Sequence, residues 1–584
     1  MPARRETRIV GPERPCLVGP SWVLRALNGH ELTGEGDPKG WPSPVRRWAL
    51  GPADKISPVP LTDNDYIVAR LQDFWGRRTP WQRRLWNLGS TQILREVLES
   101  AHFLREGHFS EKTVSSLAAS ATRQVGRDPG FGPGPIRKEI ASALSGIHKD
   151  SAAIRKLQLL VDECSTAYLR EWEAVWRQGG PTPQLELTAR SLGSHLLDQG
   201  FSPDQLYRWV SSVSATNVGM SVADLFSESQ SLDSRTSHVH EVAIPIRGLP
   251  RQRQPMPATW MEAPDASKWL QDNGPPDGIA IRHNGAFLYS IEARDPWRAV
   301  EMAIDIVQSL GARVVVGLPG QAELQVGDVA IVAGSPRQYS LGRPRRQVDV
   351  HAMSREGVLY DTSHPGVAGR IRAALNLLAP LESGAPESAV AGGWAAIEAL
   401  LKRNDVMPTN SATEMGALVA CSLPRAELTT LAYAYSKEYA DSLANDIKSA
   451  ASNQERCNHL LAAIRQGSAI SLHKASDSAA LARIEEIVSD PGQVLGRVQG
   501  YVSETFTRLY RQRNLVLHAG RSDSVGMLPT LRYAPPLVGA AVDRIVHAGL
   551  RTPPIEPQVL VAKAEVAMSL IDSTTDRSVA NLLE

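Results

Sequence analysis

Apolar residues recur at three- and four-residue steps between residues 62 and 213, for example at Ile67, Leu71 and Phe74. This spacing places them on one face of a helix, so we expect a helical N-terminal domain over residues 61–226. Residues 202–205 mark one helix start, with a capping serine, a proline at the first helical position and a glutamine in the capping-box position. Residues 1–60 are instead rich in Pro, Gly and Arg with little periodicity, which predicts an irregular arm.

Residues 260–362 are predicted to form a small α/β middle domain, which follows a Ser-, Arg- and Pro-rich linker over residues 227–259. A helix is expected to start at Asp295 and Pro296, between two of the predicted strands. A strand, a helix and a strand of one sheet form a crossover that makes the two strands parallel. The predicted strands are short β-branched or apolar runs at residues 279–281, 286–291, 313–316, 329–332 and 348–351.

The chain is predicted to be helical again from residue 365 onward, so residues 363–584 are expected to form an all-α helical bundle. The fold class that follows is a multidomain, α-rich protein with a helical N-terminal region, a small α/β middle domain and this C-terminal bundle. The expected C-terminal helices cover residues 366–379, 388–403, 412–420, 428–443, 454–464, 480–488, 494–518, 537–547 and 556–570.

Composition limits the classes of site that the chain can carry. With 63 Lys+Arg against 62 Asp+Glu in 584 residues, no global positive field attracts nucleic acid, so an RNA site must be built from local charge. The four cysteines, Cys16, Cys164, Cys421 and Cys457, show no CxxC spacing, which argues against a zinc site or a disulfide framework. We expect a cytoplasmic protein, because no apolar run reaches the roughly 18 residues of a membrane span.

One histidine pair is a candidate for part of a metal site. His238 and His240 stand two residues apart and could share one side of a strand, but no third ligand follows nearby. We therefore expect no metal and no cofactor.

A predicted loop in the middle domain combines arginines with a tyrosine. This combination suits phosphate contact together with stacking on an RNA base, while a solvated surface loop is the alternative. The residues concerned are Arg337, Tyr339, Arg343, Arg345 and Arg346.

The end of the predicted helix 494–518 carries the most specific pattern of the chain. There Arg513 and Asn514 are followed, after three residues, by His518 and then by Ala519 and Gly520. This pattern resembles the signature of the HEPN superfamily, and most closely its Apea-like branch, in which a small residue and a glycine follow the histidine. Residues 394–400, Trp-Ala-Ala-Ile-Glu-Ala-Leu, are similar to an early helix of Apea-like HEPN domains.

The resemblance implies a HEPN bundle of four or five helices that forms a homodimer, with two motifs facing one cleft. It also implies a metal-independent endoribonuclease that leaves a 2′,3′-cyclic phosphate and a 5′-OH. HEPN proteins act as toxins and in antiviral defence, so an antitoxin or a phage-derived trigger is an expected partner beside RNA. A non-catalytic HEPN module that binds RNA or a nucleotide is the alternative, and a purely structural protein is a third interpretation.

The chemistry of the three motif residues fits this activity. Histidine can take the proton of a ribose 2′-OH or give one to the leaving 5′-oxygen. Arginine stabilises the charge that develops on the phosphate, and Asn514 could orient the histidine or hold a phosphate oxygen. The expected catalytic residues are therefore Arg513, Asn514 and His518.

Helix geometry predicts how these residues are presented. At about 100° per residue, Arg513 projects into the same sector as the apolar stripe of its helix, so its charge requires an anionic partner. We hypothesise that Glu398 is that partner. Arg511, Asn514 and His518 fall on another side and are expected to face outward. The stripe consists of Val498, Val502, Phe506, Leu509 and Val516.

Overall fold

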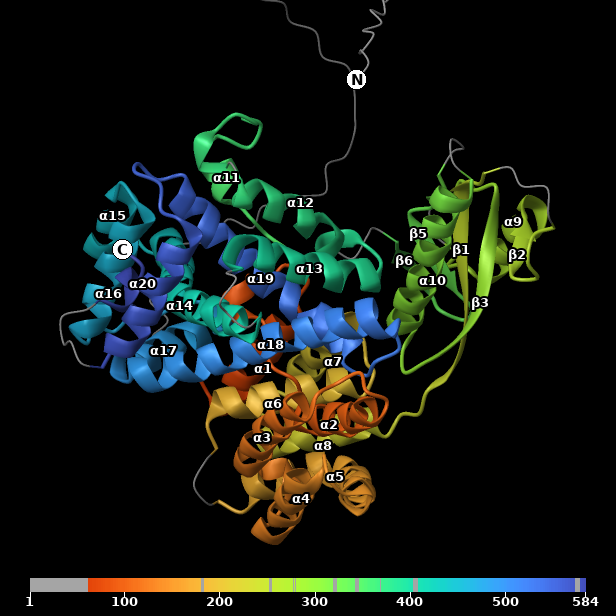
Figure 1. The fold of residues 1–584 in the computed structure, drawn as a ribbon, viewed down its shortest axis with the longest axis horizontal. Coiled ribbons are helices and arrows are strands. Elements are labelled where there is room, and N and C mark those ends of the chain that lie inside the picture. The colour runs from red at the N-terminus through yellow and green to blue at the C-terminus, as the bar shows by residue number, and fades with distance from the viewer. Residues whose placement is uncertain are drawn as a thin grey trace, which may run out of the picture. The chain divides into compact units, whose positions relative to one another are not determined.

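The structure is a computed structural model, and the residues that it describes begin at Leu61. They are residues 61–179, 183–250, 255–276, 278, 280–318, 323–341, 346–367, 369–402, 408–572 and 578–584. The arm expected over residues 1–60 lies outside them. Over the described residues the chain has twenty α-helices and six strands, which confirms an α-rich chain with a small sheet (Figure 1).

Eight helices precede the sheet and share one hydrophobic core, in which Leu71, Leu157 and Trp172 are fully buried. The predicted start at Ser202 is confirmed, because its hydroxyl accepts a hydrogen bond from the Gln205 backbone N–H at 3.2 Å. The helices are α1 (Asp63–Trp75), α2 (Ser90–Arg105), α3 (Glu111–Arg127), α4 (Gly134–Gly146), α5 (Ser151–Arg177), α6 (Leu185–Asp198), α7 (Pro203–Thr216) and α8 (Val222–Asp233).

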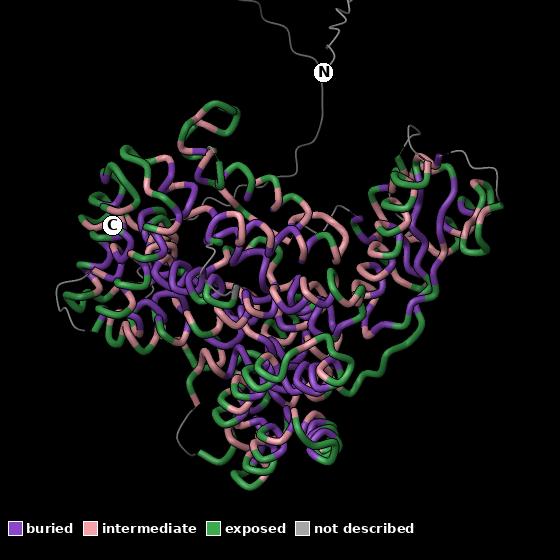
Figure 2. Tube along the Cα trace, in the orientation of Figure 1, coloured by how far each residue is buried: buried purple, intermediate pink, exposed green. Residues whose placement is uncertain are grey.

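The middle of the chain forms an antiparallel sheet with strand order β2-β3-β1-β5-β6, and β4 also pairs with β1. Helix α10 (Pro296–Gly317) covers the face that carries Val242 and Ile244, and α9 (Ala263–Asn273) covers the face that carries Ala243 (Figure 1). Figure 2 shows the central strands as largely buried. The strands are β1 (His238–Gly248), β2 (Trp260–Glu262), β3 (Gly285–Ala293), β4 (Gln325–Val326), β5 (Val329–Val332) and β6 (Gln338–Ser340).

Three expectations for this region are wrong. The expected strand at residues 313–316 is the last turn of α10, so the parallel strand–helix–strand unit does not form. The helix hydrogen bonds continue through three valines because β-branched residues weaken a helix by only a few tenths of a kcal/mol each. The expected linker 227–259 contains the end of α8 and the central strand β1. The apolar run of β1 is short and is flanked by polar residues, so the composition of the segment resembles that of a linker. Residues 348–351, expected as a strand, have no regular structure.

The remaining helices share a second large core, in which Trp394, Phe506 and Leu509 are fully buried. The two helices expected over 412–420 and 428–443 are one, α14, with Pro424 inside it. The helices are α11 (Ala352–Arg355), α12 (Arg370–Ser383), α13 (Pro386–Leu401), α14 (Pro408–Glu438), α15 (Ser442–Ser449), α16 (Asn453–Arg465), α17 (Ala475–Ser489), α18 (Pro491–Ala519), α19 (Met527–Gly549) and α20 (Pro557–Leu570).

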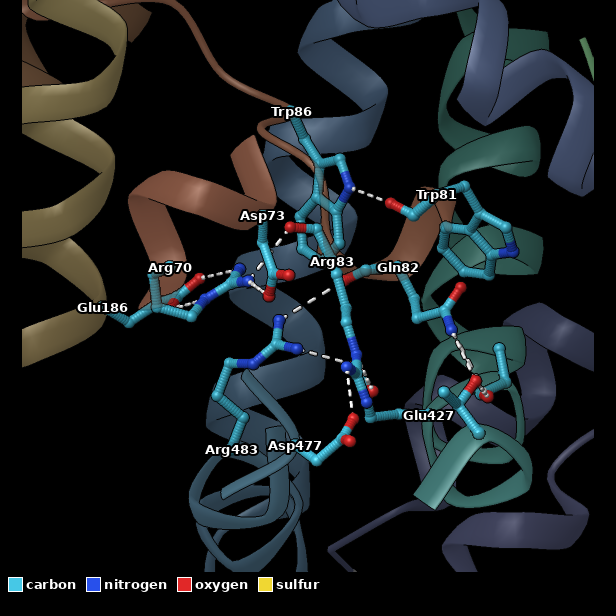
Figure 3. A network of polar contacts seen from close by, with 12 residues as sticks. Arg70, Asp73, Trp81, Gln82, Arg83, Trp86, Glu186, Glu427, Asp477 and Arg483 are labelled. Carbon is cyan, nitrogen blue, oxygen red and sulfur yellow. Dashed lines mark hydrogen bonds and ion pairs between the residues drawn. The ribbon is translucent and has the colours of Figure 1, made fainter. Parts of the chain in front are cut away.

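A buried network of charges joins the N-terminal helices to α14 and α17 (Figure 3). Arg83, which follows α1, donates to Glu427 and to Asp477, each at 2.7 Å. Arg483 donates to the other oxygen of Glu427 at 2.6 Å, and Arg70 donates to the Arg83 carbonyl at 3.0 Å. Removing one partner of such a network leaves an unpaired buried charge, so the network holds these helices in one arrangement.

In the described part of the chain, no helix combines the length and the apolar character that crossing a bilayer requires.

Candidate nucleic-acid site at the end of α18

Helix α18 is capped at both ends, and Arg513, Asn514 and His518 lie near its C-terminal end. Its first turn is capped by Asp490, whose side chain accepts a hydrogen bond from the Gln493 N–H. Its last residue is followed by Gly520 in the left-handed conformation, with φ of 63°, a conformation that glycine commonly adopts at the end of a helix. His518 therefore sits in the last turn, beside the carbonyl end of the helix dipole.

The structure brings the three motif residues together. The Arg513 Nη1 donates to the Asn514 Oδ1 at 3.0 Å and lies 3.2 Å from the His518 Nε2. A guanidinium has no acceptor, so Nε2 must accept this hydrogen bond and the imidazole proton must be on Nδ1. His518 is exposed, and Arg513 and Asn514 are half-buried, so the group is open to solvent.

The hypothesised ion pair between Glu398 and Arg513 does not form. Among the ion pairs of the described residues none joins the two, and the Arg513 guanidinium points to His518 instead. Helix α13 does pack along α18 at this level, since the rings of Trp394 and Tyr510 lie 5.0 Å apart. The helix angle predicts only the direction of the Arg513 Cβ. The long, flexible side chain of Arg513 carries the guanidinium from there to the solvent-exposed surface.

The expected outward position of Arg511 is also wrong. Arg511 is buried and its Nη2 lies 3.1 Å from Glu504 and 3.6 Å from Glu96, a residue of α2. The same Glu96 accepts two hydrogen bonds from the Arg508 Nε, at 2.7 and 3.0 Å. Helix α18 is thus buried on a second side, because α2 covers it there. Nothing in the sequence pattern of α18 identifies Glu96, which lies more than 400 residues earlier.

Helix α2 also fixes the segment that follows the motif. The carboxylate of Glu99 accepts hydrogen bonds from the Ser524 hydroxyl at 2.7 Å and the Val525 N–H at 2.9 Å. The Gln92 side chain donates to the Val525 carbonyl at 2.9 Å, and Gln512 of α18 donates to Ser524 at 3.0 Å. The position of the motif therefore depends on a helix of the N-terminal region.

The second expected RNA site does not have the stacking face that was predicted. Tyr339 is buried in β6. Its ring packs edge to face with the ring of Trp297, with 5.2 Å between the ring centres, and its hydroxyl forms a hydrogen bond with the Ser335 hydroxyl at 2.7 Å. A ring covered in this way offers no face to a base. Arg337 is exposed, with its guanidinium 5.7 Å from the centre of the Trp297 ring.

The other arginines of that set do not complete such a site either. Arg346 donates to the Leu381 carbonyl at 3.2 Å, and its own backbone N–H donates to the Glu382 carbonyl at 3.3 Å. Burial lowers the pKa of Arg346 from its ordinary value, although Asp305 and Glu382 act to raise it. Arg346 therefore binds the end of α12 rather than a ligand. Arg343 and Arg345 lie outside the described residues.

Among the residues that the structure describes, no group of three His, Cys, Asp or Glu side chains is arranged to hold a metal ion. The rings of His238 and His240 lie side by side, with 3.9 Å between the ring centres.

No family model, curated protein or solved structure matches this chain. Support for a function comes therefore from the residues and from their contacts. Among these contacts, the motif at the end of α18 gives the most specific indication of a function, because it places a solvent-exposed histidine beside a permanently charged arginine.

Proposed function

We propose that this protein is a metal-independent endoribonuclease of the HEPN type, with Arg513, Asn514 and His518 as its catalytic residues. The observation that carries the proposal is that the Arg513 Nη1 lies within hydrogen-bond distance of both Asn514 and the exposed His518. In this scheme four or five of the C-terminal helices, which share one hydrophobic core, form the HEPN-type bundle around α13 and α18. The remaining C-terminal helices are additions to it.

The reaction requires an internal attack on the RNA backbone. The Nε2 of His518, which carries a lone pair, takes the proton of the ribose 2′-OH. The 2′-oxygen then bonds to phosphorus, and the bond from phosphorus to the 5′-oxygen breaks. Arg513 turns from His518 to the phosphate and stabilises its added charge, while its hydrogen bond to Asn514 is kept. The products are a 2′,3′-cyclic phosphate and a 5′-OH.

A second chain completes this chemistry, because the leaving 5′-oxygen needs a proton from the side opposite to the attack. One histidine cannot serve both sides at once, so we propose a homodimer that places two copies of His518 at one phosphate. Exposed apolar residues near the motif support such a contact. Leu517 is 53% exposed beside His518, and Val525 and Leu528 are 41% and 38% exposed in the segment that follows.

Cleavage of total RNA in EDTA tests the proposal. We expect cleavage by the wild-type protein, and its loss in His518→Ala and in Arg513→Ala. His459→Ala and Arg465→Ala are matched controls, because both side chains are exposed on α16 and form no hydrogen bond or ion pair among the described residues. RNA binding without any cleavage would favour the non-catalytic module instead, and neither binding nor cleavage would leave a structural protein.

The cellular role that we propose is that of a toxin or an antiviral defence effector. An active ribonuclease harms its own cell, so an antitoxin or a phage-derived trigger is the expected regulator. Induced expression should arrest growth with the wild-type chain and not with His518→Ala at equal protein level. Equal arrest by both chains would contradict this role.

A further inference from the structure

A cavity of about 800 Å³ lies away from the motif, between the N-terminal helices and α18. Its wall is formed by residues of α2, α3 and α6 on one side and of α14, α17 and α18 on the other. None of the three proposed catalytic residues lines it. Its volume lies within the range of small-molecule sites, which is roughly 300–1,000 Å³.

Two glycines of α18 keep this space open. Gly496 and Gly500 lie one turn apart on the cavity wall, inside a long helix. A Cβ added at either position would meet no atom within 4 Å. Glycine inside a helix costs about 1 kcal/mol relative to alanine, so these two positions give up stability without any gain in packing. By contrast, Gly416 of α14 is required by packing, since a Cβ there would collide with Ser503 of α18.

Two exposed arginines, Arg123 and Arg127, lie one turn apart on α3 at the same wall. Among the described residues their side chains form no ion pair or hydrogen bond, although the charge of Arg123 helps to lower the pKa of Glu504. Residues four apart on a helix lie on the same side, so both charges can reach one anionic group.

The acidic residues of the wall form their ion pairs and hydrogen bonds with groups other than these two arginines. Arg70 and Arg190 hold the pKa of Glu186 well below its ordinary value, even though burial acts to raise it. Each of the five carboxylates is engaged by other groups: Glu186 by Arg70 and Arg190, Glu427 by Arg83 and Arg483, Glu504 by Arg511, Glu486 by Arg497, and Asp128 by Ser90, Tyr168 and Trp172.

The rest of the wall is suited to an apolar or planar group. Leu187, Ile487 and Val494 line the cavity, and the half-buried ring of Tyr501 follows Gly500 directly. The bare backbone at the two glycines lets a flat ring approach the helix closely, as Cβ atoms would not. A ligand that uses both features has a planar ring and an anionic group.

We infer that this cavity binds a nucleoside phosphate, with its phosphate at Arg123 and Arg127 and its base against Gly496 and Gly500. Charge-assisted hydrogen bonds from two guanidinium groups hold the phosphate, and the apolar wall holds the base. The inference does not depend on ribonuclease activity, because it concerns residues outside the motif.

Titration calorimetry with ATP, GTP and inorganic phosphate tests the inference, with the full chain in its His518→Ala form. We expect at least one nucleotide to bind with a Kd below about 1 mM and inorganic phosphate to bind at least about tenfold more weakly. Equal affinity for phosphate and nucleotides, or no nucleotide binding, would overturn it.

Substitutions that fill the cavity distinguish it from other sites. Gly500→Leu and Gly496→Leu place side chains in open space and should abolish binding while the helix is retained. Arg123→Ala with Arg127→Ala should weaken binding by at least about tenfold. Gly311→Leu is the matched control, because Gly311 lies in α10, away from the cavity, and also has open space at its Cβ. Wild-type binding by the filled variants would overturn the inference.

Discussion

Arg508 and Glu96 form a buried ion pair between α18 and α2, in which the arginine Nε lies 2.7 and 3.0 Å from the two carboxylate oxygens. Both residues are almost fully buried, at 1% and 4% exposure. The pair also engages Arg511, at 3.6 Å from Glu96, so three charges of two helices meet here. The helix that carries the proposed catalytic residues is thus anchored to the N-terminal region by charge as well as by packing.

Glu96→Gln should destabilise the protein, because it leaves Arg508 buried without its counter-ion. Loss of one partner of a buried pair costs about 3–5 kcal/mol. The control is Glu139→Gln, which removes an exposed partner of Lys156 and should cost no more than about 1 kcal/mol. Thermal unfolding of the three proteins measures both effects. Equal melting temperatures for Glu96→Gln and Glu139→Gln would show that the buried pair does not anchor α18.

The cavity glycines should respond to alanine in the opposite way from a packed glycine. Gly496→Ala and Gly500→Ala should each raise the stability by up to about 1 kcal/mol, because alanine is the better helix former and the new methyl meets open space. Gly416→Ala should lower it, since the methyl would collide with Ser503. Denaturant unfolding monitored by circular dichroism checks the signs. A loss of stability in the first two variants would mean that the cavity is filled by protein.

One buried carboxyl should make the stability depend on pH. Burial raises the pKa of Asp198 to about 6, although Arg532 and the Gly89 N–H act to lower it. The protonated form therefore favours the folded state, and its contribution is complete below about pH 4 and is lost as the pH rises through about 6. Relative to Asp198→Asn, the wild-type protein should lose up to about 3 kcal/mol over this window.

Unfolding of both proteins at several pH values between 4 and 7 measures this difference. The asparagine is neutral throughout and can still accept the hydrogen bond that Gly89 donates to Asp198 at 2.9 Å. A difference that stays constant across the window would contradict the raised pKa.

The proposed dimer should depend on the apolar surface beside the motif. Leu517→Asp places a charge where Leu517 is 53% exposed, so it should convert dimer to monomer without unfolding the chain. Sedimentation velocity measures the mass, and the RNA assay measures the activity of the same sample. The monomer should be inactive. An active monomer would show that one chain supplies both the acid and the base.

Local features of the chain were predictable from the sequence, because they depend on neighbouring residues. Ser202 and Asp295 cap their helices as expected, each by accepting a hydrogen bond from a backbone N–H three residues on. The presence of Arg513, Asn514 and His518 within two turns of one helix is also local. Their contact was not predicted, because helix geometry placed Arg513 on the apolar side and its flexible side chain reaches His518 instead.

Features that depend on distant segments were not predictable. The burial of Arg511 follows from Glu96 of α2, which no periodicity of α18 can indicate. The place of β1 in the sheet follows from pairing with β3 and β5, which lie later in the chain. The cavity likewise requires α3 and α18 to face each other across it, so its arginines and glycines have meaning only in the folded chain.

The central claim is that His518 and Arg513 cleave RNA by attack of the ribose 2′-OH. Mass spectrometry of a short RNA after incubation with the protein in EDTA tests it most directly. We predict fragments that end in a 2′,3′-cyclic phosphate and begin with a 5′-OH, present with the wild-type protein and with His459→Ala and absent with His518→Ala. Intact RNA with the wild-type dimer, or the same fragments from His518→Ala, would contradict the claim.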